Sequence, residues 1–264
     1  SNNTSLGYFA LGSNTTASEN TALGKSTLYA NTTGANNTAV GANALDANTT
    51  GAGHVAVGKE ALKSCTTANS NTAVGQLAAS ALTTGWACVA IGDQAMGAGV
   101  VTGNSNNAVG YQAGENLTTG SNNNFFGTYA GEETTTGEFN VAIGQEALEA
   151  NTTGSNNVAI GFRSLESNTG GTNTAVGSYA AYLNTSATHI CAFGYDALGD
   201  NTTGSYNTAF GSNALCKNTT GTNNTAVGRN ALNANTGGNN TGVGFEALDS
   251  NTTGGDNTSV GSHS

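Results

Sequence analysis

A glycine that follows a large apolar residue recurs along the whole chain at an almost constant interval. The interval is 17 residues, with one of 18 and two of 16, and the sixteen positions are Gly7, Gly24, Gly41, Gly58, Gly75, Gly92, Gly110, Gly127, Gly144, Gly161, Gly177, Gly194, Gly211, Gly228, Gly244 and Gly261. Such periodicity is typical of repeat proteins, whose units bury apolar residues only against neighbouring units. We call this residue the anchor glycine and number the unit from it, so that position −1 directly precedes it.

The length and content of the unit predict a parallel β-solenoid. Repeats of paired helices need about 33–47 residues. Here each unit has two short extended pieces, Asn-Thr-Ala-Val before the anchor glycine and Ala-Leu after it, joined by Asn-Thr-Thr-Gly turns. We therefore expect an all-β fold, a β-solenoid or β-roll of sixteen coils about 4.8 Å apart. Residues 1–264 should form one continuous array, and because both ends fall inside a repeat, it should be a segment of a longer fibre.

The composition excludes several classes of partner. The chain carries six Lys and Arg against 16 Asp and Glu, a net charge of −10, and its charged residues make up 8% of the total. A chain this acidic lacks the basic surface that binds nucleic acid or anionic membranes. No apolar run approaches the ~18–20 residues of a transmembrane helix, so we expect no membrane insertion.

Two apolar columns are expected to pack inside the stack. Position −1 is always large and apolar, and position +4 is mostly Leu, as in Val40 and Leu45. Position −2 is Ala in twelve units, and Phe125 is its one large exception. A column held to Ala favours close contact with another copy of the chain, because a solvated face would vary more. A narrow interior that admits only Ala is the alternative explanation.

Two columns of Asn, at positions −4 and +7, predict hydrogen-bonded ladders along the stack. Glycosylation is the competing explanation for part of position +7, where seven residues begin an Asn-Thr-Thr acceptor sequence: Asn14, Asn31, Asn48, Asn151, Asn201, Asn218 and Asn251.

The unit Asn-Thr-Ala-Val-Gly-x-x-Ala-Leu-x-x-Asn-Thr-Thr-Gly resembles tandem repeats of phage tail-fibre proteins. Its Val-Ala-Ile-Gly variant, at residues 89–92, 141–144 and 158–161, is similar to the head repeat of trimeric autotransporter adhesins. The resemblance spans the whole chain. It implies a trimeric, extracellular fibre on a virion or cell surface, which adheres to a partner such as a cell-surface glycan or carries a binding tip.

No catalytic or cofactor-binding pattern accompanies the repeats. The histidines, His54, His189 and His263, lie in distant units without metal-ligand spacing or a paired nucleophile, so we expect no enzyme, no cofactor and no metal. The acidic residues Glu132, Glu149 and Glu166 share position +5 in consecutive units. We expect them to spread into water, although Ca²⁺ binding would also relieve their repulsion.

Cysteines and aromatic residues depart from the consensus. Cys65 with Cys88, and Cys191 with Cys216, are candidate disulfides, and free buried thiols are the alternative. Aromatic residues at positions +1 and +2 are candidate contacts for a glycan receptor, or else a ladder of rings that covers the strands. These residues are Tyr111, Tyr129, Phe162, Tyr179 and Tyr195.

The sequence thus predicts a non-catalytic structural or adhesive fibre module that associates with copies of itself. Two other functions are open. One is a glycosylated extracellular filament, with sugar on the Asn-Thr-Thr turns. The other is an ice-binding solenoid that uses the Thr column at position −3, which contains Thr4, Thr21, Thr38, Thr72, Thr174, Thr208, Thr225, Thr241 and Thr258.

Overall fold

The computed structural model describes residues 2–264 as two β-solenoid units, one ending at Gly137 and the other beginning at Glu138. Each strand has three residues, and the described chain contains no helix. The first unit holds β1 (Thr4–Leu6), β2 (Thr21–Leu23), β3 (Thr38–Val40), β4 (Val55–Val57), β5 (Thr72–Val74), β6 (Val89–Ile91), β7 (Asn107–Val109) and β8 (Asn124–Phe126). The second holds β9 (Val141–Ile143), β10 (Val158–Ile160), β11 (Thr174–Val176), β12 (Cys191–Phe193), β13 (Thr208–Phe210), β14 (Thr225–Val227), β15 (Thr241–Val243) and β16 (Thr258–Val260).

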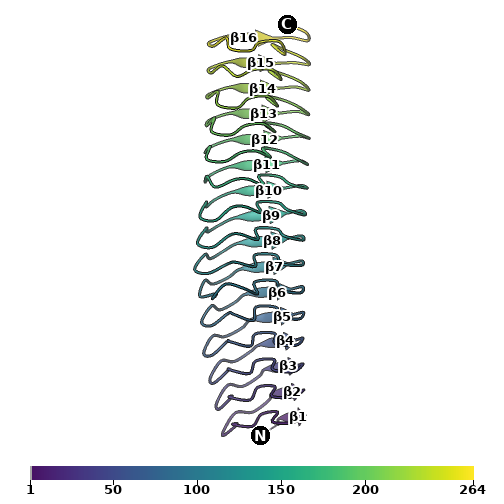
Figure 1. The fold of residues 1–264 in the computed structure, drawn as a ribbon, viewed down its shortest axis with the longest axis vertical. Coiled ribbons are helices and arrows are strands. Elements are labelled where there is room, and N and C mark those ends of the chain that lie inside the picture. The colour runs from purple at the N-terminus through teal and green to yellow at the C-terminus, as the bar shows by residue number, and fades with distance from the viewer. Residues whose placement is uncertain (1) are drawn as a thin grey trace. The chain divides into compact units, whose positions relative to one another are not determined.

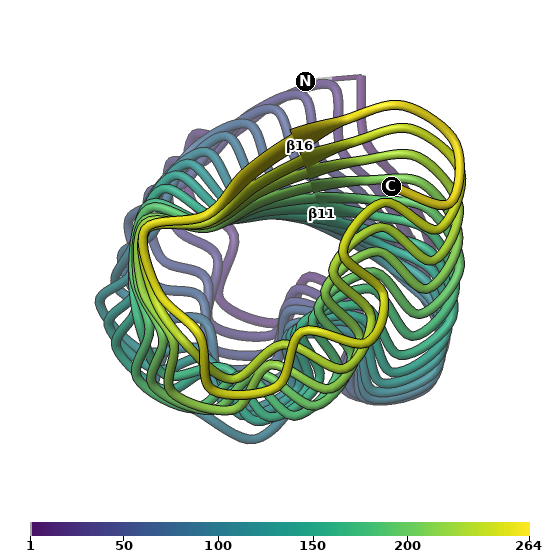
Figure 2. The ribbon, with the colours of Figure 1, turned by 90° about the horizontal axis from the view of Figure 1, so that it is seen from above.

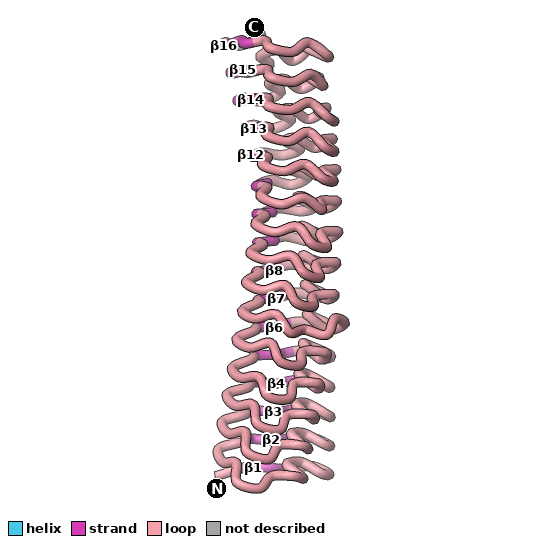
Figure 3. The backbone as a smooth tube through the Cα atoms, turned by 90° about the vertical axis from the view of Figure 1, so that its left-hand side faces the viewer, coloured by secondary structure: helices cyan, strands magenta, loops and turns pink. Residues whose placement is uncertain are grey.

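Within each unit every strand pairs in parallel with the next strand along the chain, position for position. Thr38 of β3 pairs with Val55 of β4, for example, and Val40 pairs with Val57. The strands follow one another in chain order (Figure 1), and turns and loops make up the rest of each coil (Figure 3). Seen from above, each turn of the ribbon closes on itself with the strand along one side (Figure 2). The predicted all-β parallel solenoid is confirmed.

The anchor glycines are required by the backbone. Gly41 has φ +128°, and a Cβ there would lie 2.4 Å from the carbonyl oxygen of Gly58 in the next coil. Non-glycine residues at positions −5, +2 and +4 also adopt positive φ, as in Asn36 (60°), Asn43 (57°) and Leu45 (52°). L-residues enter this region at a cost of roughly 1–2 kcal/mol each. Packing against neighbouring coils holds them there.

The interior of each coil is lined by positions −2, +3 and +4. In the third coil these residues are Ala39, Ala44 and Leu45, all fully buried. The prediction that position −1 joins them is wrong, because Val40 and its equivalents point outward. Successive side chains of a strand alternate between its faces. Since Asn37 and Ala39 face inward, the first and third residues of the strand must face outward.

The Ala column at position −2 lies inside the coil and does not contact another copy, so the explanation from a narrow interior holds. Ala39, Ala56, Ala73 and Ala90 are all fully buried. Their methyl groups leave room for the Leu column at position +4, which crosses the same interior.

Phe125 fits the same column because its neighbours are reduced to glycine. The ring is fully buried. Position +4, usually Leu, is Gly114 in the coil that contains β7 and Gly131 in the coil that contains β8. A Cβ at Gly114 would lie 2.8 Å from Cδ2 of Phe125, and one at Gly131 would lie 2.6 Å from Cε1. The ring of Phe125 thus lies against two glycines that stand where Leu is found in most other coils.

Candidate functional site

The first and third residues of the strands form a regular surface on each unit, which we call the outer strand face. No strand of β1–β16 contains a charged residue, although the chain has a net charge of −10. The third residues are large and apolar, and much of their surface is open to solvent: 44% for Leu23, 39% for Ile91 and 41% for Ile143. Contiguous exposed apolar surface of this kind marks an interaction site.

Aromatic rings enlarge the outer strand face in the second unit. Phe193 and Phe210 stack with their ring centroids 5.6 Å apart, and Phe210 is 57% exposed. Cys191 lies on the same face at the start of β12 and is partly exposed. The sequence-based interpretation missed this surface because it placed position −1 inside. The signal was present, since positions −4 and −1 differ by three residues and cannot share one face of a strand.

The two Asn columns form the predicted ladders. At position +7, Nδ2 of Asn48 donates to Oδ1 of Asn31 at 2.9 Å and to the carbonyl oxygen of Gly51 at 3.0 Å. At position −4, Nδ2 of Asn37 donates across the coil to the same carbonyl oxygen at 3.0 Å. Oδ1 of Asn37 accepts from the backbone N–H of His54. These bonds satisfy buried polar groups that would otherwise be costly.

A Thr column that the sequence-based interpretation did not identify supports the turns. At position +8 the hydroxyl of Thr32 donates to the carbonyl oxygen of Thr49 at 3.0 Å, and that of Thr49 donates to Thr66 at 3.1 Å. The second residue of each Asn-Thr-Thr turn is therefore structural, whereas the third, such as Thr50, is exposed.

His54 takes the place of an Asn in the ladder at position −4. Its ring is fully buried, with Nε2 2.8 Å from the carbonyl oxygen of Ala68, and Nδ1 accepts from the backbone N–H of Asn71 at 3.2 Å. This pattern assigns the neutral Nε2–H tautomer, in which the ring copies the donor and acceptor of an Asn amide. Burial lowers the pKa of His54.

The four cysteines are free thiols in the structure, so the two candidate disulfides are not formed. Cys65 and Cys88 replace ladder Asn residues and are buried, as is Cys216. Burial raises the pKa of Cys65 to about 12, and burial together with the nearby Asp196 carboxylate raises that of Cys216 to about 12. Thiols with such a pKa are poor nucleophiles.

Most of the candidate glycosylation sites lie inside the coil. Five of the seven are fully buried: Asn31, Asn48, Asn151, Asn201 and Asn218. Asn14 and Asn251 are half-buried. A buried Asn whose amide belongs to a ladder has no room for a sugar, so glycosylation at these five positions conflicts with the fold.

The five candidate aromatic contacts form edge-to-face ladders. Tyr111 and Tyr129 lie 5.4 Å apart between ring centroids, Phe162 and Tyr179 lie 5.3 Å apart, and Tyr179 and Tyr195 lie 6.1 Å apart. Tyr195 is the most open of them, at 56% exposed. The structure thus brings Phe162, Tyr179 and Tyr195 together in consecutive coils of the second unit, and Tyr111 with Tyr129 in the first.

An acidic cluster in the second unit surrounds one arginine. The carboxylates of Glu146, Glu149 and Glu166 lie within 4.8 Å of one another. Nε of Arg163 lies 2.5 Å from Glu146 and 3.4 Å from Glu166. Burial raises the pKa of Glu166, and Arg163 opposes that shift. We assign no metal to this cluster.

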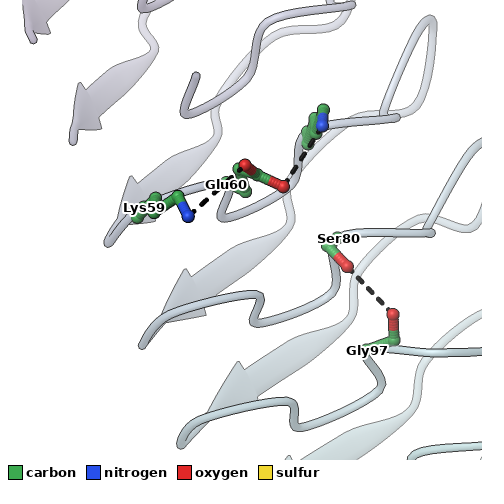
Figure 4. A network of polar contacts seen from close by, with 5 residues as sticks. Lys59, Glu60, Ser80 and Gly97 are labelled. Carbon is green, nitrogen blue, oxygen red and sulfur yellow. Dashed lines mark hydrogen bonds and ion pairs between the residues drawn. The ribbon is translucent and has the colours of Figure 1, made fainter. Parts of the chain in front are cut away.

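Other surface contacts are short-range and carry little energy. Nζ of Lys59 lies 3.9 Å from a carboxylate oxygen of Glu60, and the hydroxyl of Ser80 donates to the carbonyl oxygen of Gly97 at 2.9 Å (Figure 4). Exposed ion pairs of this type contribute about 0–1 kcal/mol. The described surface has no pocket, and none of the described residues forms a membrane-spanning helix.

Large apolar side chains are exposed in the 18-residue coil, which ends at Gly110, and in the turn before it. Val100 is 59% exposed and Trp86, in the preceding turn, is 53% exposed, whereas Val101 is fully buried. The backbone N–H of Trp86 donates to Oδ1 of Asn104 at 3.0 Å.

Comparison with family models, curated proteins and solved structures finds no match to this chain.

Proposed function

We propose that the chain is a non-catalytic structural module of an extracellular fibre, in which copies associate through the outer strand face. The observation that carries the proposal is the uncharged, half-exposed apolar column at the third strand position. Ile91 and Ile143, for instance, keep about two fifths of their surface in water, at 39% and 41%. The resemblance of the repeat to those of tail fibres and adhesin heads supports an extracellular fibre of three copies.

The energy of association requires many coils. Fully burying one apolar side chain of this size contributes about 1.5–3 kcal/mol, so a half-exposed one offers about 1 kcal/mol. The eight coils of one unit then offer about 8 kcal/mol, within the ~4–15 kcal/mol that association costs. A few coils would not suffice. A long regular face therefore fits a partner of the same length and spacing, and a second copy has both.

The chemistry of the reactive side chains supports a structural role. His54 is neutral and held by two hydrogen bonds in the ladder, and the thiols of Cys65 and Cys216 are buried with raised pKa values. His54 and Cys65 take the place of ladder Asn residues, and Cys216 lies buried at position +5. Because these side chains serve packing and hydrogen bonding inside the coil, we assign the function to the outer strand face.

Sedimentation equilibrium of charge variants tests the proposal. Ile143→Asp and Val227→Asp each place a carboxylate on the outer strand face at side chains that are 41% and 37% exposed, so a single copy should still fold. We expect the wild type to have a mass that is a multiple of 26.0 kDa, and the double variant to be a 26.0 kDa monomer with unchanged circular dichroism. The control is Thr153→Asp, on the exposed turn. A monomeric wild type, or dissociation by the control alone, contradicts the proposal.

Cys191 offers a second readout of the same face. In a cyclic assembly of parallel copies, identical residues meet at the same height. Cys191 is the one partly exposed cysteine among the four, since Cys65, Cys88 and Cys216 are buried. A short bismaleimide should therefore join copies in the wild type and not in Cys191→Ser. Equal cross-linking of both proteins would place the contact elsewhere.

An ice-binding solenoid is the second candidate function. The Thr side chains at position −3 do lie on the outer strand face, and strand pairing aligns Thr208 with Thr225 and Thr225 with Thr241. Thermal hysteresis measured on the monomeric Ile143→Asp/Val227→Asp variant, and on the wild type, separates the two functions. Activity in a monomeric wild type would favour ice binding, and its absence in an assembled wild type favours the fibre.

A further inference from the structure

Among the asparagines that begin an Asn-x-Ser/Thr acceptor sequence, two groups lie in opposite environments. Six of them lie in the ladder at position +7 and are fully buried: Asn31, Asn48, Asn151, Asn184, Asn201 and Asn218. Four lie at position −5, in Asn-Asn-Thr, and are exposed: Asn2, Asn36, Asn223 and Asn239. The second set is distinct from the Asn-Thr-Thr sites that the sequence singles out.

In each ladder Asn, Nδ2, the atom that would carry sugar, already donates a hydrogen bond inside the coil. Nδ2 of Asn201 donates to Oδ1 of Asn184 at 2.9 Å and to the carbonyl oxygen of Gly204 at 3.1 Å. Both amide hydrogens are thus used, and N-linkage would remove one of them. Space is also absent, because even a Cβ at Gly204 would lie 2.7 Å from Oδ1 of Asn201.

The asparagines at position −5 have the opposite environment. Asn36, Asn223 and Asn239 have φ of 60°, 58° and 61° at a turn, and their backbone N–H groups bond the preceding coil, that of Asn239 donating to Thr222 at 2.9 Å. The backbone is therefore fixed while the side chain stays in solvent. Bulky groups already fit this position, since Tyr206 occupies it with 59% of its surface exposed.

We infer that the folded chain accepts N-linked sugar at Asn2, Asn36, Asn223 and Asn239 and not at the six buried ladder asparagines, and that sugar on a ladder Asn prevents its coil from closing. Transfer breaks the bond between sugar C1 and the donor phosphate and forms a bond between C1 and the Asn Nδ2. One amide proton passes to solvent, and the nucleoside diphosphate leaves with the electron pair of the broken bond. The chain must consequently fold before it meets an enzyme that modifies unfolded Asn-x-Ser/Thr sequences, or fold where no such enzyme is present. This inference does not depend on association through the outer strand face.

Modification of the folded protein tests the first half. The folded chain is incubated with a soluble N-glycosyltransferase and UDP-glucose, and the sites are mapped by mass spectrometry. We expect one hexose on each of the four exposed asparagines and none on the six buried ones. A synthetic peptide spanning residues 44–55 is the control, and its Asn48 should be modified. Hexose on Asn48 of the folded protein, or none on the exposed asparagines, would overturn the inference.

Secretion through a cell that glycosylates unfolded chains tests the second half. Wild-type chains should carry sugar on the ladder and lose protease resistance. A variant with Ala at the third residue of each ladder acceptor, including Thr50→Ala and Thr203→Ala, keeps every Asn and the structural Thr at position +8. These third residues are exposed. This variant should regain resistance, whereas the matched Thr→Ser variant should not. Protease-resistant wild type with sugar on Asn48 and Asn201 refutes the inference.

Discussion

Exchange of large and small residues around Phe125 gives the sharpest test of the interior. Truncation to Ala leaves a cavity between Gly114 and Gly131, because neither glycine has a side chain to fill it. Burial of Phe125 is complete. Phe→Ala substitutions at such sites cost about 3–5 kcal/mol. We expect Phe125→Ala to fall in this range, and the loss to concentrate in the coils that contain β7 and β8, because each coil contacts only its neighbours.

Leu at position 131 should be harmful with Phe125 present and helpful without it. Its Cβ alone would lie 2.6 Å from the ring, so Gly131→Leu should cost about 1–3 kcal/mol or more from overpacking. The backbone can accept Leu, since Gly131 has φ 60° and Leu148 holds the equivalent position at 57°. Phe125→Ala/Gly131→Leu restores the consensus pair of Ala and Leu. It should be more stable than Phe125→Ala alone, with a coupling of about 1–3 kcal/mol.

Urea denaturation followed by circular dichroism and by Trp86 fluorescence measures this cycle in the unit that contains all three residues. Phe125→Ala with both Gly114→Leu and Gly131→Leu should approach wild-type stability. Additive effects, or a double variant less stable than Phe125→Ala, would refute the assignment of one shared interior volume.

Three further predictions follow from the ladders and the anchor glycines. His54→Asn should fold normally and should lack the loss of stability that the wild type shows below pH 6.5. The pKa of His54 is lowered in the folded chain, so the unfolded chain binds a proton that the folded chain does not. Urea titrations at pH 5 and 7 should show that the free energy of unfolding changes with pH by up to about 1.4 kcal/mol per pH unit more in the wild type than in the variant. Gly58→Ala should cost at least about 1–3 kcal/mol, since φ is +137° and the new Cβ would lie 2.2 Å from the carbonyl oxygen of Gly75. Gly53→Ala should cost less in the same thermal melts, because the atom nearest to its new Cβ lies 3.7 Å away. Asn201→Ala should cost about 1–3 kcal/mol, because Oδ1 of Asn184 loses its donor, whereas the carbonyl oxygen of Gly204 keeps Nδ2 of Asn207. Faster hydrogen exchange in the neighbouring coils would reveal the loss, and unchanged exchange would contradict a hydrogen-bonded ladder through Asn201.

The repeat alone predicts the coil, its parallel strands and the Asn ladders, because a fixed period of 17 residues places like residues in line. Whether the side chains of each column point into the coil or out of it is harder to predict. Val40 is large and apolar, which suggested burial, yet Asn37 and Ala39 already fix the inward face by strand alternation. Read with that constraint, the sequence would have placed Val40 and its equivalents outside.

Other features depended on contacts between coils. Gly114 and Gly131 could have been linked to Phe125 from the sequence, since both occupy the Leu position in the coils beside it. Positive φ at residues such as Leu45 could not, because isolated L-residues avoid it and only packing holds them there. The role of His54 was likewise hidden, because its ring resembles an Asn amide only once both nitrogens have partners.

X-ray diffraction from an oriented, concentrated sample tests the stacking of coils most directly. Hydrogen-bonded parallel strands that succeed one another at each coil predict a strong reflection at about 4.8 Å along the stacking direction. A pattern without it, or with the 5.4 Å pitch of α-helices, would contradict the in-register stacking on which every column described above depends.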